Sequence, residues 1–396
     1  MKRILILFLI FIFAIPVYSA KITIGKNLEI LVDGKPFFPI MVWAQPIERN
    51  GKDLVEFNKS LGINTFVGHK ADTRSPKEYL DECAKRNVFA CISAGYDIKE
   101  DEQMVSNLKD HPALLFWWFP DEPDNYSPKT KKLPKYSPDE LLPSYQLIKK
   151  KDPNHPVALN FGSGLATGTP PIPISKYKGY MKCCDILSCT SGYPENKPDK
   201  VKKLHFIAKG LEKLAKFDET KPRSTWIGVS YIGAEGGRKP DPEERAPKPE
   251  EVKAEVWMAI VSGATMIAYF PHSWSPSYEP NRIPNDVQEE MKKVNRQITE
   301  LTPVICGPNS KIEVTATVKE DSMADIHTLV KEGNEKLYIF ASNFKDKEGE
   351  VEFSVKGFGN CEVTVYEEGR KIVMTNGKFA DKFKIYEPHI YVIDKK

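Results

Sequence analysis

Acidic and aromatic side chains come together in one short stretch of the sequence, LLFWWFPDEPD at residues 114–124. A run of six apolar residues leads into Pro120, and the acids Asp121, Glu122 and Asp124 follow at once. Carboxyl groups can transfer protons as general acids or bases, or attack an electrophilic carbon as nucleophiles. Two interpretations are open from this stretch alone: the acids solvate the end of a buried strand, or the strand directs one of them at a substrate.

Residues of the same two kinds follow most of the other apolar runs of the chain. They are Trp43 and Gln45, His69, Tyr96 and Asp97, Tyr193 and Glu195, Glu235, and finally His272, Trp274 and Glu279. Carbohydrate sites combine carboxylates, which act at the anomeric carbon, with flat apolar rings that cover sugar faces. A phosphate site would instead need a Gly-rich turn or a helix N-terminus with basic partners, and a metallohydrolase would need several His and Asp residues at strand ends. The set therefore predicts a carbohydrate site that uses neither a metal nor a cofactor.

Eight runs rich in β-branched and aromatic residues have the continuous apolar character of strands that are buried on both faces. These predicted strands span residues 37–44, 63–68, 88–96, 114–119, 155–161, 185–193, 225–231 and 265–270. Amphipathic segments with helix-start signals separate them, for example Ser75-Pro76 and Ser137-Pro138. The pattern predicts an α/β fold, a (β/α)8 TIM barrel over residues 21–304, in which the C-terminal strand ends carry the chemistry. A doubly wound open sheet is the alternative, but it usually has a Gly-rich first turn, and none follows the first run.

Other β-structure is predicted on both sides of the barrel segment. Before it, ITIGKNLEILVDGKPFFP at residues 22–39 predicts a hairpin that turns at Asp33-Gly34. After residue 304, apolar and polar residues alternate between turn signals such as Asn376-Gly377. This alternation predicts a C-terminal antiparallel β-sandwich over residues 305–396.

Residues 1–20 have the features of a secretory signal peptide. Lys2 and Arg3 precede about twelve apolar residues, and the small residues Ser19 and Ala20 follow. The alternative is a transmembrane anchor, but the apolar stretch is shorter than the roughly 20 residues that span a bilayer, and Pro16 interrupts it. We therefore expect an exported protein, secreted or periplasmic, with no membrane attachment after cleavage.

The charge balance gives no reason to expect a nucleic acid or an acidic membrane as a partner. The chain has 57 basic and 54 acidic residues, so removal of Lys2 and Arg3 leaves a net charge near +1. The seven cysteines include no CxxC pair, which argues against structural zinc. Cys306 and Cys361 either form a disulfide or remain buried thiols. The sequence leaves the oligomeric state open.

The fourth-strand motif WWFPDEP resembles that of the retaining (β/α)8 glycoside hydrolase clan, whose members typically have Asn-Glu-Pro there. The lead-in DGKPFFPIMVW, the eighth-strand segment GATMIAYFPHSW and the C-terminal β-sandwich are also similar to members of that clan. The resemblance implies that Glu122 is the general acid/base and that Trp274 stacks against the sugar at the cleavage site. Asp121 replaces the clan's Asn, which binds the sugar 2-hydroxyl, and its charge would raise the pKa of Glu122.

The clan's nucleophile, a Glu at the end of strand seven, has no counterpart at the expected place. In the segment WIGVSYIG, Val229 occupies that position, and Glu235 is the next acid, in a loop rich in Gly and Pro. Glycines allow this loop either to fold Glu235 back over the barrel or to leave it in solvent. Glu195 and Glu279 are the substitutes, and each is more typical of a surface acid.

For the residues at the remaining strand ends, two roles stay open: contact with the substrate, or a structural role. The candidate substrate-binding residues are Asp121, Trp274, His272, Tyr193, Trp43, His69 and, more weakly, Gln45. Trp117 and Trp118 must point to opposite sides of their strand, and core packing is favoured for Trp226 and Trp257.

The leading hypothesis is an exported glycoside hydrolase that cleaves O-glycosidic bonds of a poly- or oligosaccharide, with Glu122 and Glu235 as its catalytic residues. The alternative is a non-catalytic carbohydrate-binding protein on a degenerate barrel, which Val229 favours. A third hypothesis, a cell-surface scaffold without a ligand, agrees least with the acidic and aromatic residues at the strand ends.

Overall fold

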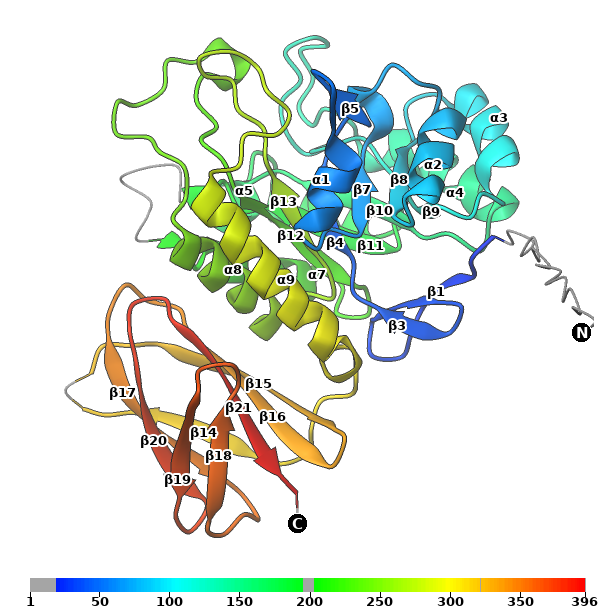
Figure 1. Ribbon diagram of the computed structural model, residues 1–396. Coiled ribbons are helices and arrows are strands. Elements are labelled where there is room, and N and C mark those ends of the chain that lie inside the picture. The colour runs from blue at the N-terminus through cyan, green and yellow to red at the C-terminus, as the bar shows by residue number, and fades with distance from the viewer. Residues whose placement is uncertain (1–18, 195–202, 321, 396) are drawn as a thin grey trace, which may run out of the picture.

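A closed barrel of parallel strands forms the centre of the molecule, and an antiparallel sandwich lies beside it (Figure 1). The structure is a computed structural model that describes residues 19–194, 203–320 and 322–395. The predicted (β/α)8 barrel and C-terminal β-sandwich are confirmed. The predicted signal peptide falls almost entirely on residues 1–18, outside the described residues.

Eight parallel strands follow one another around the barrel in chain order. They are β4 (Ile40–Trp43), β7 (Thr65–Val67), β8 (Phe89–Ser93), β9 (Leu114–Trp118), β10 (Val157–Phe161), β11 (Ile186–Thr190), β12 (Arg223–Gly228) and β13 (Ile267–Phe270). Pairing of β13 with β4, for instance Ala268 with Met41, closes the ring. Each strand lies within or overlaps one of the eight predicted runs, because a strand covered on both faces needs apolar residues at nearly every position.

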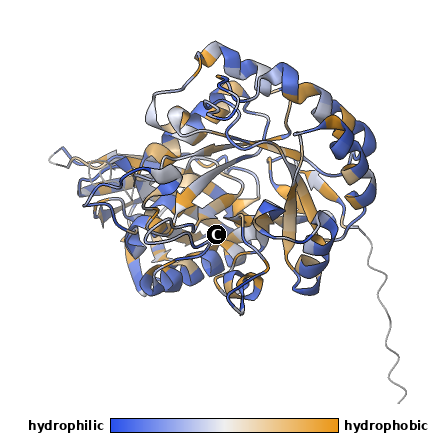
Figure 2. Cartoon of the chain, turned by 90° about the horizontal axis from the view of Figure 1, so that it is seen from above, coloured by the Kyte–Doolittle hydropathy of each residue, from blue (hydrophilic) through white to orange (hydrophobic). Residues whose placement is uncertain are grey.

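Helices cover the outside of the barrel, and Figure 2 shows their hydrophilic faces turned outward around the apolar strands. They are α1 (Leu54–Ser60), α2 (Pro76–Lys85), α3 (Ile98–Leu108), α4 (Pro138–Lys151), the short α5 (Gly164–Thr167) and α6 (Tyr177–Tyr180), α7 (Phe206–Phe217), α8 (Pro249–Val261) and α9 (Asn285–Ile305). Ser75 and Ser137 form capping boxes at the starts of α2 and α4, as their sequence signals predict.

Alternation along each strand divides the core into a barrel interior and a layer beneath the helices. Trp118 packs in the interior cluster with Met41 and Trp226, whereas Trp117 packs on the helix side. The interior cluster also takes in Ile22 and Ile30 from a small sheet of β1 (Ile22–Ile24), β2 (Ile30–Val32) and β3 (Lys35–Phe37). The predicted hairpin is β2–β3, and β1 extends it to three strands. This sheet contributes to the apolar packing inside the barrel.

The C-terminal sandwich consists of a three-stranded and a five-stranded antiparallel sheet around their own apolar core. The strands are β14 (Val314–Val318), β17 (Gly349–Val355) and β20 (Lys378–Phe383) in one sheet, and β15 (Ile326–Gly333), β16 (Lys336–Asn343), β21 (Pro388–Asp394), β18 (Cys361–Val365) and β19 (Arg370–Met374) in the other. Figure 1 shows α8 and α9 on the side of the barrel that faces the sandwich. The ring of Trp257 in α8 stacks on Phe340 of β16 at 5.8 Å, so an apolar contact joins the two parts.

All seven cysteines are free thiols, and Cys306 and Cys361 do not form a disulfide. Six of the seven are buried, among them Cys306, while Cys361 is partly exposed. Within the described residues, none of the helices is both long and apolar enough to cross a membrane.

Candidate active site

A pocket of about 350 Å3 brings together residues that follow strands far apart in the sequence. Its lining residues are Trp43, Asp121, Glu122, Asn160, Ser163, Thr190, Gly192, Tyr193, Trp226, Glu235, Phe270, His272 and Trp274. Many of them lie at or just after the C-terminal ends of barrel strands, where enzymes with this fold carry their reactive groups. Of the nine residues that the sequence suggested as catalytic or substrate-binding, all except His69 and Gln45 lie around this one pocket.

Glu122 is held at the end of β9 by contacts with the next two strands. Its backbone has a positive φ of 48°, a conformation that is uncommon outside glycine, and its N–H donates to the carbonyl of Asn160 at 2.9 Å. The Thr190 hydroxyl donates to Oε1 at 2.9 Å, and Asn125 Nδ2 donates to Oε2 at 2.6 Å. The strained backbone and the two side-chain bonds fix the direction of the carboxyl group.

The carboxyl groups of Asp121 and Glu122 both have raised pKa values. Burial, followed by the charge of Asp121, raises the pKa of Glu122 to about 7. Burial also raises the pKa of Asp121 to about 6, and the nearby charge of Glu235 contributes to the increase. Lys135, whose Nζ donates to the main-chain oxygen of Asp121 at 2.8 Å, opposes it. Near neutral pH Glu122 can therefore carry a proton, as a general acid must.

Asn160 at the end of β10 links the carboxyl pair to the pocket floor. Its Nδ2 donates to Asp121 Oδ1 at 2.8 Å and to Thr190 Oγ1 at 3.3 Å. Its Oδ1 accepts a hydrogen bond of 3.0 Å from the Trp226 ring N–H. Trp226, for which core packing was expected, is thus both a core residue and part of the pocket. Asn160 is the one polar residue of β10, whereas Thr190 ends a strand that also contains Ser188, and the sequence alone singled out neither of them.

Glu235 lies in the pocket because its loop is fastened to the loop that follows β13. The N–H of Trp274 donates to the carbonyl of Ile232 at 2.8 Å, and the N–H of Ala234 donates to Ser275 Oγ at 3.1 Å. Gly233 fits between these two contacts with φ +73°, and a Cβ there would lie 2.4 Å from Ser275 Oγ. Of the two placements that the sequence left open for Glu235, the structure has the one over the barrel.

The side chain of Val229 packs among the apolar residues on the helix side of the barrel and is fully buried. Two positions earlier Ile227 belongs to the same cluster, while Trp226 faces the interior. A carboxylate at position 229 would therefore be directed away from the pocket. At the position where the nucleophile was expected, this chain has no carboxylate, and the side chain of Val229 points away from the pocket.

Aromatic rings form a wall and part of the floor of the pocket. The rings of Tyr193 and Phe270 are stacked at 4.9 Å and 22°, and Phe270 and Trp274 lie at 6.0 Å and 18°. These three near-parallel rings provide apolar surfaces of the kind that cover sugar faces. Trp43 and Trp226 also line the pocket and meet edge to face at 5.1 Å.

Comparison with known proteins gives a result at the level of structure alone. No family model and no curated protein matches the sequence. The structure is similar to a glycoside hydrolase family 5 protein from Bacteroides vulgatus, with 13% identity, a TM-score of 0.58 and coverage of 94% of this chain and 93% of that one. It is also similar to Gan42B, a family 42 β-galactosidase from G. stearothermophilus, with 9% identity, a TM-score of 0.60 and coverage of 96% and 100%.

The fold is similar to that of these two glycoside hydrolases. The resemblance noted from the fourth-strand motif is therefore confirmed as a likeness of fold over nearly the whole chain. The pocket lies at the C-terminal ends of the barrel strands, where enzymes with this fold carry their reactive groups.

His272 reaches the pocket as a neutral ring. It is 4% exposed, and burial lowers its pKa to about 4. Its Nε2 lies 3.1 Å from the carbonyl of Ala44, which only accepts, so Nε2 carries the proton. That leaves Nδ1 as an acceptor for a hydroxyl group.

His69 and Gln45 do not line the pocket. Gly68, with φ +81°, turns the chain into a short 3-10 helix at His69–Ala71, and His69 lies beside Lys70 and Tyr96 in a separate hollow near α2 and α3. The side chain of Gln45 is buried and donates to the carbonyl of Pro280 at 2.6 Å.

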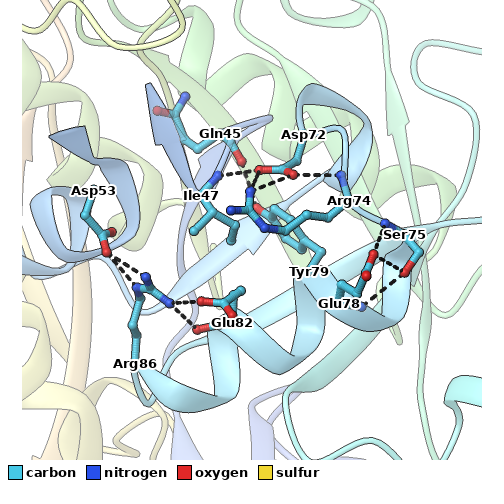
Figure 3. A network of polar contacts seen from close by, with 10 residues as sticks. All are labelled: Gln45, Ile47, Asp53, Asp72, Arg74, Ser75, Glu78, Tyr79, Glu82 and Arg86. Carbon is cyan, nitrogen blue, oxygen red and sulfur yellow. Dashed lines mark hydrogen bonds and ion pairs between the residues drawn. The ribbon is translucent and has the colours of Figure 1, made fainter. Parts of the chain in front are cut away.

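Figure 3 shows how the loop after β4 is fixed next to α2. The Tyr79 hydroxyl donates to the carbonyl of Gln45 at 2.9 Å, and the N–H of Ile47 donates to Asp72 at 2.7 Å. Arg74 pairs with the same Asp72 carboxylate. Gln45 therefore belongs to a structural network, and the predicted substrate contacts of His69 and Gln45 have no support from their positions.

Of the two substitute acids, Glu279 does not line the pocket. Glu279 pairs with Arg49 at 3.8 Å on the rim. Glu195 lies outside the described residues. Among the residues that the structure describes, the pocket has three acidic side chains and no Lys or Arg, and no group of His, Cys, Asp and Glu could hold a metal ion.

Proposed function

We propose that the protein is an exported glycoside hydrolase that cleaves O-glycosidic bonds, with Glu122 as the general acid. The observation that carries this proposal is the Glu122 carboxyl group, which has a pKa of about 7 and lines the same pocket as Glu235 and three near-parallel aromatic rings. The pocket's three acids and lack of Lys and Arg among the described residues favour a neutral or cationic sugar, because an anionic one would be repelled.

Protonated Glu122 would give its proton to the glycosidic oxygen as the bond from that oxygen to the anomeric carbon breaks. Glu235, as a carboxylate, would either attack the anomeric carbon or take a proton from an attacking water. Carboxyl groups about 5–5.5 Å apart give retention, and those about 6.5–9.5 Å apart give inversion. The anomer first released, followed by NMR, distinguishes the two routes.

A non-catalytic carbohydrate-binding protein is the second candidate. The buried Val229 favours it, since strand seven provides no carboxylate at the position where the resembling clan carries its nucleophile. The rings and polar groups of the pocket would still bind a sugar in that case.

The test measures sugar release from aryl glycosides and polysaccharides by the wild type, Glu122→Gln, Glu235→Gln and the control Glu279→Gln. We expect each pocket variant to lose about 10²- to 10⁴-fold in kcat/KM, and Glu122→Gln to lose least on substrates with good leaving groups. Glu279→Gln should keep wild-type activity. Activity unchanged in Glu122→Gln would refute its role, and a wild type that binds oligosaccharide without cleaving it would select the binding protein.

Export is proposed from residues 1–20, which have the composition of a signal peptide. Expression of the full chain followed by N-terminal sequencing of the mature protein tests it. We expect cleavage after Ala20 or close to it and recovery of the protein outside the cytoplasm. An uncleaved chain that remains in the cytoplasm would refute export without affecting the proposed activity.

A further inference from the structure

A small cavity of about 140 Å3 lies where three parts of the chain meet, away from the candidate active site. The loop between β1 and β2 lines it at Leu28, and the barrel lines it at Arg223 and Thr265. The end of α9 contributes Cys306, and strand β15 of the sandwich contributes Lys331. Arg223 begins β12 and Thr265 precedes β13, so the cavity is at the N-terminal end of the barrel.

Arg223 brings unsatisfied hydrogen-bond donors to this cavity. Its Nε and Nη1 atoms are buried and have no hydrogen-bond acceptor in the described part of the chain. The guanidinium remains charged at any physiological pH, so burying it without partners costs free energy. Gly263, with φ +84°, leaves room for it: a Cβ at that position would lie 2.9 Å from Nη2.

Thr265 adds a third unsatisfied group beside Arg223. Its N–H donates to the Arg223 carbonyl at 3.0 Å, which makes the two residues neighbours across adjoining strands. Its Oγ1 is buried and has no hydrogen-bond partner within the described ranges. Buried polar atoms in native proteins are nearly always paired, and three such atoms on two neighbouring residues that line the cavity lack a partner in the described part of the chain.

Lys331 supplies a second cation from the sandwich. It is 6% exposed, and its Nζ donates to the Gly307 carbonyl at 2.6 Å, which leaves two N–H groups of the ammonium for other acceptors. Glu29 is the nearby carboxylate that partly offsets its charge. That carboxylate already accepts the N–H of Asn27 at 2.8 Å.

We propose that this cavity binds a small oxyanion of the phosphate or sulfate class, held by the Arg223 guanidinium, the Thr265 hydroxyl and the Lys331 ammonium. Oxyanions present several acceptors at once and match the donor fork of arginine. Because these three residues come from the barrel and the sandwich, the bound ion joins the two parts. It would stabilise the folded chain by mass action, since the unfolded chain does not assemble the site.

The test follows the thermal unfolding midpoint of the whole protein as sodium phosphate or sulfate replaces sodium chloride at constant ionic strength. We expect a saturable rise of roughly 3–5 °C at a hundredfold excess over Kd, and no rise with chloride alone. Arg223→Met should abolish the rise and Thr265→Val should weaken it. Lys356→Met, which removes an exposed lysine from the sandwich, should keep it in full.

Three outcomes would overturn the proposal. A rise that persists in Arg223→Met would place the ion elsewhere, and an equal rise with chloride would refute the oxyanion class. No rise with either oxyanion, together with an unchanged or higher midpoint in Arg223→Met, would mean that water satisfies the three groups. If Arg223→Met does not fold, titration calorimetry with phosphate on the wild type and Thr265→Val gives the decision: weaker binding in the variant supports the site, and equal binding refutes it.

Discussion

The hydroxyl group of Thr190 donates a 2.9 Å hydrogen bond to Oε1 of Glu122, so the last residue of β11 holds the carboxyl group that follows β9. Asn125 holds the other carboxyl oxygen at 2.6 Å. Both bonds favour the charged form of Glu122, while burial and the charge of Asp121 favour the neutral form. The raised pKa of the proposed acid is a balance between these opposing effects, and single substitutions should shift it in either direction.

Thr190→Val removes one of the two bonds that favour the ionised carboxylate. The pKa of Glu122 should then rise by about one to two units, because a hydrogen bond to a charged group contributes about 1.5–3 kcal/mol and one pKa unit equals about 1.4 kcal/mol. The alkaline limb of the profile of kcat/KM against pH should shift to higher pH, and Thr190→Ser should keep the wild-type profile. A Thr190→Val profile identical to the wild type would show that this bond does not set the pKa.

Asp121→Asn should shift the same limb in the opposite direction. Catalysis needs protonated Glu122, so wild-type activity should fall as pH rises through about 7. Removing the charge of Asp121 lowers the pKa of Glu122, and the fall should begin at a lower pH. Asn can still accept the Asn160 bond through its Oδ1. Glu279→Gln, on the rim, is the control that should leave the profile unchanged, and an upward shift in Asp121→Asn would contradict the electrostatic account.

The barrel was predictable from the sequence because its strands are buried on both faces and therefore are continuous apolar runs. The same reasoning placed acids at the end of the fourth strand, and the resemblance to the glycoside hydrolase clan singled out Glu122 among them. It could not select Asn160 or Thr190, because a single polar residue at a strand end has the same sequence pattern whether it contacts a ligand or only its neighbours. Their roles depend on the positions of β10, which pairs with β9, and of β11, which pairs with β10.

The directions of two loops, which the sequence does not show, decide the positions of His69 and Glu235. His69 follows its strand as the other candidates do, but Gly68 takes a left-handed conformation and the chain turns towards α2 and α3. Glu235 was undecided from sequence because its position depends on contacts with Trp274 and Ser275, which are about forty residues away in the chain. Neither the direction of a loop nor its contacts with residues far away in the chain can be predicted from the local sequence.

Gly233→Ala should displace Glu235 from the pocket. The new Cβ would lie 2.4 Å from Ser275 Oγ, so the loop must move away from its anchor. Gly237→Ala is a matched control: its φ of +78° is close to the +73° of Gly233, but a Cβ there meets nothing within 4 Å. Both variants carry a strain of about 1–2 kcal/mol from the left-handed backbone, and only Gly233→Ala adds the clash.

We expect kcat to fall at least tenfold in Gly233→Ala and to change little in Gly237→Ala, as measured on the same aryl glycoside. A tenfold loss in kcat corresponds to about 1.4 kcal/mol in the activation free energy, which a small displacement of a catalytic carboxylate readily exceeds. Equal losses in the two variants would attribute the effect to backbone strain rather than to the position of Glu235.

Val229→Glu should not create a strand-seven nucleophile. The wild-type side chain packs among the apolar residues on the helix side, so the new carboxylate would be buried without a partner and away from Glu122. The variant should lose about 3–5 kcal/mol of stability and gain no activity at any pH. Val229→Thr, which has the same shape without a charge, should unfold at a temperature much closer to that of the wild type. Increased activity in Val229→Glu, or in Val229→Glu combined with Glu235→Gln, would mean that position 229 can face the pocket, and Glu235 would then no longer be needed as the second carboxylate.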